Sequence, residues 1–287
     1  MKSAEISGLP NRAMVAIMIL ALAVAGLGTV AAQEPQRAPS RFTYVDLVDL
    51  AEASNLVVKA QIRRQATLEP ERSPGLQPGT ARLYLEAETQ ALFAGNAAIG
   101  ESLRLLADFP IDDRGRPQRL QDSVFVFFGR EVSGRPGEIQ LLTPYSFMVA
   151  DPYEEERLRM VLRQMAAPER PPHVTGVREA LSIEGNLAGE SETQFFLETR
   201  ESVPVSITVI RRPGMAPQWG VAWSEIVDQS ARPPVSETLA WYSLACFLPR
   251  NLPPASNLAR DEASRTRALQ DYNVVLDQLG PCIRNRD

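Results

Sequence analysis

Lysine and histidine are almost missing from this chain of 287 residues. Only Lys2 and Lys59 among its 30 basic residues are lysines, and His173 is its one histidine. A catalytic triad or a Cys–His pair would have to use that single imidazole, and a Ser–Lys dyad beyond the first residues would have to use Lys59. His173 follows two prolines in a polar segment, so we expect a solvated linker residue. Lys59 alternates with apolar neighbours on a predicted strand, so we expect it to face outward, protonated and solvated.

Cysteine is scarce as well. Cys246 and Cys282 are the only two in the sequence. In an exported protein an even pair predicts one structural disulfide, whereas a reactive thiol pair would favour a close C-x-x-C spacing. One histidine and a bonded cysteine pair leave no tetrahedral set of zinc ligands. We therefore expect no metal site and no cofactor.

The first 32 residues predict export. A basic start precedes an apolar run of about 15 residues from Ala13 to Leu27, and small residues follow at Val30 and Ala32. This pattern is typical of a signal peptide, with cleavage before Gln33. A retained anchor is the alternative, but the run is shorter than the roughly 20 residues that span a bilayer. The sequence has no second run of that length, so we expect no membrane span after cleavage.

Charge and composition indicate which partners are excluded and what kind of organism makes the protein. The net charge is −5, and a mildly acidic chain is a poor ligand for nucleic acid, whose phosphates attract basic surfaces. Arginine in place of lysine, with abundant alanine and 23 prolines, indicates a GC-rich bacterial genome. Together with the export signal, this composition predicts a periplasmic or secreted protein of a Gram-negative bacterium.

The pattern of the first half predicts a short helix followed by strands. Residues 33–41 are polar and contain prolines, as in a flexible leader. Residues 125–128 are apolar on both faces, so their strand should be covered on both sides. The expected elements are a helix at 42–54, strands at 56–62, 82–93, 102–109, 123–132 and 139–149, and exposed loops at 69–79 and 112–118.

A capped helix closes that half. Asp151 and Pro152 suit its N-cap and first turn, and the proline-rich segment 167–173 cannot continue it. The second half then predicts strands at 177–183, 193–199, 203–211 and 219–227, and helices at 236–247 and 258–279. The expected fold class is α+β and mostly β: an OB-like small β-barrel over 42–166, a linker at 167–173, and a second α+β domain over 174–287 with two C-terminal helices and one disulfide.

The order of elements in the first half resembles a known family. A short helix, a strand at 56–62, a long strand at 82–93, a strand ending in Phe109 and Pro110, a strand ending in Gly129 and a last strand at 145–149 look like the small secreted OB-fold domains related to netrin-like modules and tissue inhibitors of metalloproteinases. The resemblance implies a small β-barrel. It does not imply zinc chelation by an N-terminal cysteine, because the predicted mature N-terminus has none.

Four residues of the second half are candidate ligand contacts. Trp219 and Trp223 are four apart in a predicted strand, hence on one face and roughly 13 Å apart. They fit either a platform for sugar rings or the cover of a core. Arg211 and Arg212 precede Pro213 and Gly214, so they form either a basic tip for an anion or a solvated turn.

Carboxylates are the remaining candidates for acid–base chemistry. A glycosidase pair is an open alternative, and geometry must decide it. The segment 112–116 has too many arginines for a calcium loop, so we expect a turn. The candidate carboxylates are Glu184, Glu190, Glu192, Glu198 and Glu201.

The sequence therefore predicts an exported, non-catalytic binding or interaction protein of the bacterial cell envelope, with a protein of the envelope or periplasm as its partner. The contacts are expected on the 69–79 and 112–118 loops, since polar loops of this length commonly carry function. The alternatives are a hydrolase of envelope polymers that uses a carboxylate pair, and a periplasmic carrier of carbohydrate or another small ligand.

Overall fold

The computed structural model describes residues 42–95, 99–224 and 232–286. The predicted export signal 1–32 and leader 33–41 lie outside these residues. The first described helix, α1 (Tyr44–Ala53), begins with a capping box: Thr43 Oγ1 accepts from the Asp46 amide, and the Asp46 carboxylate accepts from the Thr43 amide. This reciprocal arrangement satisfies two of the amides that every helix N-terminus leaves unpaired.

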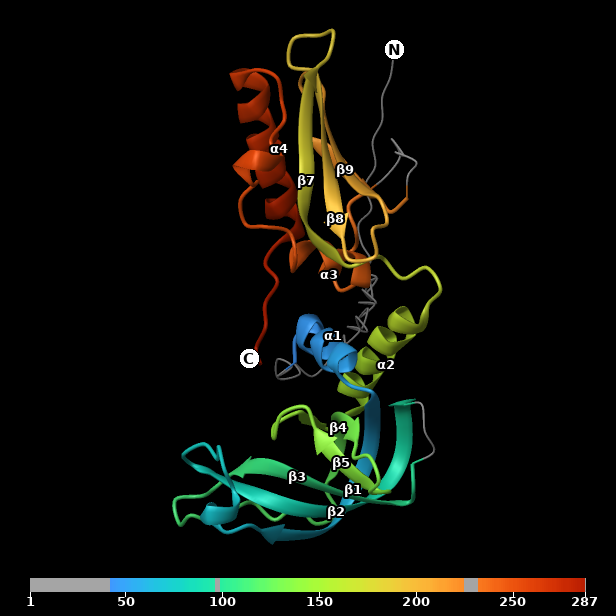
Figure 1. The fold of residues 1–287 in the computed structure, drawn as a ribbon, viewed down its shortest axis with the longest axis vertical. Helices are drawn as coiled ribbons and strands as arrows, with labels where there is room; N and C mark the ends of the chain where they lie inside the picture. The colour runs from blue at the N-terminus through green and yellow to red at the C-terminus, as the bar shows by residue number, and fades with distance from the viewer. Residues whose placement is uncertain (1–41, 96–98, 225–231, 287) are drawn as a thin grey trace, which may run out of the picture. The chain divides into compact units, whose positions relative to one another are not determined.

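The first sheet closes on itself as a five-strand barrel (Figure 1). Its strand order is β1-β2-β3-β5-β4, and β4 pairs with β1 to complete the ring. β3 and β5 are parallel, while the other pairs are antiparallel. This closed order is consistent with the OB-like barrel that the sequence predicts. The strands are β1 (Leu56–Thr67), β2 (Thr80–Gly95), β3 (Ser102–Pro110), β4 (Val124–Glu131) and β5 (Glu138–Leu141), and β6 (Phe147–Val149) is added outside β4.

β4 is apolar on both faces because both are covered. Phe125 and Phe127 lie in the barrel interior, whereas Val126 and Phe128 pack in a second buried cluster with α1. Full burial of each such side chain contributes about 1.5–3 kcal/mol. The strand passes closely beside β5, since a Cβ at Gly129 would lie 2.5 Å from the carbonyl oxygen of Gln140. The prediction that this strand is central and covered is confirmed.

α2 (Pro152–Ala166) follows the barrel and begins at Asp151, whose carboxylate accepts from the amides of Tyr153 and Glu154. Leu158 and Val161 on its apolar side are fully buried. The N-cap predicted at Asp151 is therefore confirmed.

The second sheet is antiparallel, in the order β10-β9-β8-β7, and α4 lies along β7 and β8 (Figure 1). Inward side chains such as Phe195 pack on Tyr272 of α4. The α4 helix begins at the N-cap Asp261 and ends at Gly280, whose φ of +73° favours glycine. These elements are β7 (Val174–Glu184), β8 (Ser191–Thr199), β9 (Val205–Arg211), β10 (Gln218–Ala222), α3 (Leu239–Ala245) and α4 (Glu262–Leu279), with single 3₁₀ turns η1 (Pro70–Arg72) and η2 (Pro254–Ser256).

The disulfide predicted between Cys246 and Cys282 is present, with the two Cα atoms 5.1 Å apart. It ties the end of α3 to the segment after α4, and that segment continues to α1. There the amides of Asn285 and Arg286 donate to the Asp46 carboxylate, at 3.1 and 3.2 Å. Arg284 Nε donates to Asp49 at 2.7 Å. We call residues 282–286 the tail clamp.

Several predicted boundaries need correction. The strand predicted at 139–149 is two strands, β5 and β6, because Thr143 and Ser146 bond to each other and turn the chain between them. The strand predicted at 219–227 ends at Ala222, and residues 225–227 lie outside the described part. The helix predicted at 236–247 begins only after the N-cap Thr238. Among the described residues, no helix combines the length and apolar character needed to cross a membrane.

Candidate functional site

A groove of about 930 Å³ lies on the outer face of the barrel. Its base is formed by β2 and β3, and its walls by the loops that join β1 to β2 and β4 to β5. The strand β5 and residues 142–144 after it complete the lining. OB barrels hold their ligands with the same face of strands 2 and 3 and with the same two loops. The groove is therefore the candidate functional site of the first half.

The floor of the groove is apolar, although alternation along β2 and β3 predicts polar side chains on this outward face. Tyr84 on β2 lies directly opposite Leu106 on β3 in the strand register. Both face outward, because their neighbours along each strand point into the barrel. Leu106 keeps 44% of its surface exposed.

A buried ion pair fixes one wall. Arg82 Nε and Nη2 donate to the two carboxylate oxygens of Asp108 at 2.8 and 2.9 Å, and Nη1 donates to the Pro74 carbonyl at 3.0 Å. The hydrogen bond to Asp108 raises the pKa of the Arg82 guanidinium. Because Asp108 is buried, this bidentate pair is well shielded from water and joins the β1–β2 loop to the sheet.

Three more arginines line the groove. Arg135 pairs with Glu138 at 3.3 Å. The Arg104 side chain makes one hydrogen bond within the described residues, from Nη2 to the Pro136 carbonyl at 3.3 Å. Arg72 is exposed on η1. Glu69 adds one carboxylate to the lining.

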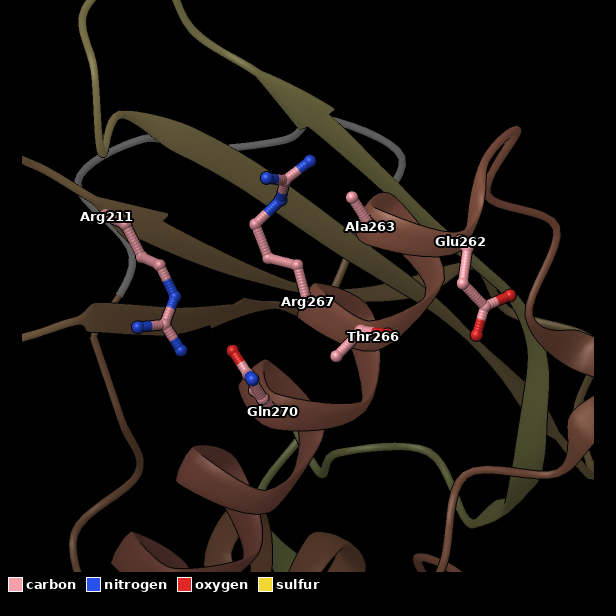
Figure 2. Close-up of a pocket in the computed structure, with 6 residues that line it drawn as sticks. All are labelled: Arg211, Glu262, Ala263, Thr266, Arg267 and Gln270. Atoms are coloured by element: carbon pink, nitrogen blue, oxygen red, sulfur yellow. The ribbon is translucent and has the colours of Figure 1, made fainter.

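A second, shallower hollow of about 510 Å³ lies between β9 and the first turns of α4 (Figure 2). Figure 2 shows Arg211 extending from β9 toward Gln270 of α4, while Glu262 points away from both. Arg211 Nε donates to Asp271 Oδ1 at 2.6 Å. Asp271 is fully buried beneath this hollow.

The polar groups under this hollow satisfy one another. Thr193 Oγ1 donates to the Asp271 carboxylate, and it lies 2.9 Å from the Ser182 hydroxyl. Arg267 donates to that same hydroxyl at 3.0 Å and to Glu184 at 2.9 Å. The network joins α4 to β7, β8 and β9. Arg211 and Arg267 therefore stabilise the fold, and their charges are already paired and not free for a ligand.

The four candidate residues of the second half do not form a common site. Trp219 is buried, and its Nε1–H donates to Gln278 Oε1 of α4 at 2.8 Å. Trp223 lies beyond the end of β10 and is partly buried against the same core. Arg211 is bonded to Asp271, whereas Arg212 is exposed on the following turn. The burial of Trp219 favours the second reading of this pair, the cover of a core, over a platform for sugar rings.

His173 lies in a cluster of charges, which corrects the expectation of an isolated, solvated residue. Its Nδ1 is 3.1 Å from Glu201 Oε1, and its Nε2 is 3.3 Å from Glu52 Oε1. Arg170 also binds Glu52. Burial alone would raise the pKa of Glu201, but hydrogen bonds from its own amide and from His173 outweigh it and lower that pKa. The cluster joins α1, the 167–173 segment and the turn after β8.

Lys59 also differs from the expectation of a solvated residue. It points out of the barrel, as alternation predicts, but α2 covers that face. Its Nζ donates to the buried Glu155 at 2.6 Å, and Glu155 also accepts from Arg159 at 3.3 Å.

The carboxylates considered for a glycosidase pair bind different partners. Glu184 binds Arg267, Glu190 accepts from the amides of Asn186 and Leu187, and Glu201 binds His173. No group of three metal-ligating side chains occurs in the described ranges.

The two loops predicted as contact elements have different positions. Glu69 and Arg72 of the 69–79 loop line the groove. The 112–118 loop is a tight turn in which Asp112 accepts from the amides of Arg114 and Arg116, and it does not contribute to the groove lining.

The sequence analysis did not select the residues of the groove floor. The available signal was alternation, since it places Tyr84 and Leu106 on the outward face of their strands. Their position opposite one another requires the β2–β3 register, which no local pattern specifies.

Comparison of the chain with models of protein families and with curated proteins finds no match. The geometry of the barrel groove and its charges are therefore the basis on which a function can be inferred.

Proposed function

We propose that this chain is an exported, non-catalytic binding protein of the bacterial envelope, and that its barrel groove holds a segment of a partner protein. The observation that carries the proposal is the outward Tyr84–Leu106 pair at the base of a groove of about 930 Å³. Exposed apolar side chains gathered in a hollow and rimmed by polar groups mark interaction sites. Tyrosine and arginine are also the residue types that most often dominate binding energy at protein interfaces.

Three further observations support the proposal. The closed barrel order agrees with the resemblance to secreted OB-fold domains. The Arg82–Asp108 pair holds the wall of the groove in place before any ligand arrives, which lowers the ordering cost of binding. The Cys246–Cys282 disulfide is compatible with an oxidising compartment such as the periplasm.

Site-specific photocrosslinking in cells tests the proposal. A photoreactive phenylalanine analogue at position 106 should yield one discrete crosslinked protein. The matched control is Leu269 on α4, which is equally exposed (45% against 44% for Leu106) but lies outside the groove. The same substitution at position 269 should yield no such species. The same crosslinked species from both positions, or none from position 106, would overturn the proposal.

A loss-of-binding variant gives an independent check. Leu106→Asp places a charge on the groove floor and should abolish capture of the crosslinked partner. Since Leu106 faces outward, the free energy of unfolding should change by less than about 1 kcal/mol. Turnover of a glycan, peptide or ester that is abolished by one carboxylate substitution would instead establish an enzyme.

A further inference from the structure

The arginines of the groove differ in whether their charge is compensated. Asp108 neutralises Arg82, and Glu138 neutralises Arg135. Within the described residues, Arg72 makes no side-chain hydrogen bond or ion pair, and Arg104 bonds only to a carbonyl oxygen. Glu69 is the one further carboxylate of the lining.

The lining has four arginines and two glutamates, and Asp108 adds a third carboxylate, so the groove carries a net charge of +1 on a chain whose net charge is −5. Arg104 and Leu106 lie two residues apart on β3 and therefore point to the same outer face, while Arg72 belongs to the loop that forms the wall. Arg104 lies opposite Glu86 and Glu138 in the strand register, but within the described residues its guanidinium bonds to neither. The guanidinium groups of Arg72 and Arg104 thus border the apolar pair of the floor without forming an ion pair. A complementary ligand has carboxylates beside an apolar side chain.

We propose that the groove binds an acidic polypeptide segment, in which glutamate or aspartate side chains pair with Arg72 and Arg104 and an apolar side chain contacts Tyr84 and Leu106. This inference rests on the function proposed above and adds the chemical class of the partner. Arginine suits this task, because its planar fork of donors binds a carboxylate bidentately.

The lining favours a polypeptide over an anionic glycan. The floor and walls are aliphatic at Leu68, Leu106 and Leu142, and Tyr84 is the only aromatic side chain in the lining. Aliphatic side chains pack well against leucine or valine but offer no flat ring on which a sugar stacks. A nucleic acid is disfavoured for the same reason, since bases bind single strands through stacking on aromatic rings.

Selection from a random peptide display library on the mature protein tests the proposal and needs no identified partner. We expect the bound peptides to be enriched in glutamate or aspartate next to leucine, valine or isoleucine. Arg72→Gln and Arg104→Gln should each weaken the binding of a selected fluorescent peptide by about tenfold in fluorescence anisotropy, the scale of one charge-assisted hydrogen bond. Raised salt should weaken binding to the unaltered protein more than binding to the double variant.

Arg212→Gln is the matched control, since Arg212 is equally an exposed arginine but lies outside the groove. It should leave the affinity unchanged. Peptides without acidic residues that lose binding with Leu106→Asp would overturn the acidic preference while leaving the proposed function intact. No enriched peptide, or peptides insensitive to every groove variant, would overturn both. Arginine-dependent binding of a polyuronate with no peptide enriched would assign the groove to anionic glycans and overturn the polypeptide class.

Discussion

Arg82 lies where the groove, the β1–β2 loop and the outer face of the barrel meet. Its partner Asp108 is buried, with 1% of its surface exposed, so loss of the guanidinium leaves a carboxylate in a site with little water. Breaking a buried pair by removal of one partner typically costs about 3–5 kcal/mol. We therefore expect Arg82→Gln to lower the free energy of unfolding by about that amount in urea titrations.

The exposed pair Arg63–Glu88 is the control for this prediction. Its side chains retain 46% and 55% exposure, and solvent screening makes the contribution of such an exposed pair to stability small. Arg63→Gln should therefore change stability little. If Arg63→Gln and Arg82→Gln lowered the free energy of unfolding equally, burial would not explain the contribution of the Arg82–Asp108 pair to stability.

Arg211 and Arg212 are adjacent but have different roles. Arg211 bonds to the buried Asp271, whereas Arg212 reaches Gln218 at only 3.4 Å on the surface. Arg211→Gln should destabilise the protein by about 2–4 kcal/mol, because the buried carboxylate loses its cation. Arg212→Gln should stay within about 0.5 kcal/mol. Chemical denaturation of both variants measures these effects. If Arg211→Gln left the stability unchanged, the Arg211–Asp271 pair would have no structural role.

At the residue scale, sequence patterns predict which side of an element a side chain occupies, and they do not predict what covers that side. Alternation places Lys59 outside the barrel, and the structure agrees. The helix that covers it, with Glu155, comes 96 residues later. The buried Asp271 was equally unforeseeable, since its acceptor role depends on Thr193 and Arg211 from two other elements.

The stability of α4 depends on pH through its N-cap residue, Asp261. Hydrogen bonds from the Ser264 amide and hydroxyl lower the pKa of Asp261 below its ordinary value of 3.8. As the pH falls, the unfolded chain therefore takes up this proton first, and the contribution of the cap disappears as the pH passes through the folded-state pKa. The cap stabilises the helix at pH above 3.8.

Hydrogen exchange measures this effect. The protection factor of the Ser264 amide should fall on acidification in the unaltered protein. Asp261→Asn keeps a side-chain oxygen at the N-cap and does not titrate, so its Ser264 protection should stay level over the same pH range. A parallel fall in both proteins would assign the change to global acid unfolding and not to the cap.

At the scale of elements, the sequence predicts a strand or helix well where interactions between neighbouring residues determine its position and its ends. The capped helix at Asp151, the strand with apolar residues on both faces and the stop at Gly280 all depend on neighbouring residues. The break between β5 and β6 was missed because apolar residues flank it on both sides, although residues 143–146 are Thr-Pro-Tyr-Ser. In the structure the chain turns there, because the Ser146 amide donates to the Thr143 carbonyl and the Thr143 amide donates to the Ser146 hydroxyl.

At the scale of the whole molecule, one buried cluster includes residues from both halves. It contains Val126 and Phe128 of the barrel together with Phe195 and Tyr272 of the second half. We therefore expect one cooperative unfolding transition. All three tryptophans lie in the second half, so their fluorescence should lose intensity or shift at the same urea concentration as the far-ultraviolet dichroism of both sheets. Two separated midpoints would show that the halves unfold independently.

The disulfide should stabilise the molecule measurably. The two cysteines are 36 residues apart, and closing a loop of that length contributes about 3–4 kcal/mol in the chain-entropy model. The Cys246→Ser/Cys282→Ser double variant should lose that amount in denaturant titrations under oxidising conditions. Addition of a reductant should destabilise the unaltered protein and leave the double variant unaffected. A reductant effect on the double variant would point to a cause other than this bond.

The tail clamp has a consequence for the order of events in synthesis. Asn285 is made 239 residues after Asp46, which at 5–20 residues per second is a delay on the order of 10–50 s. By the end of that time the residues of the α1 capping box and of the barrel strands have all been made, but the tail amides that bind Asp46 are still missing. Asp49 likewise lacks Tyr242 until residue 242 has been made, and it lacks Arg284 until the tail has been made. The polar groups of α1 at Asp46 and Asp49 thus gain all their partners only once the tail clamp has been made. A chain interrupted shortly before Arg284 contains every strand that the structure describes but lacks these partners of α1.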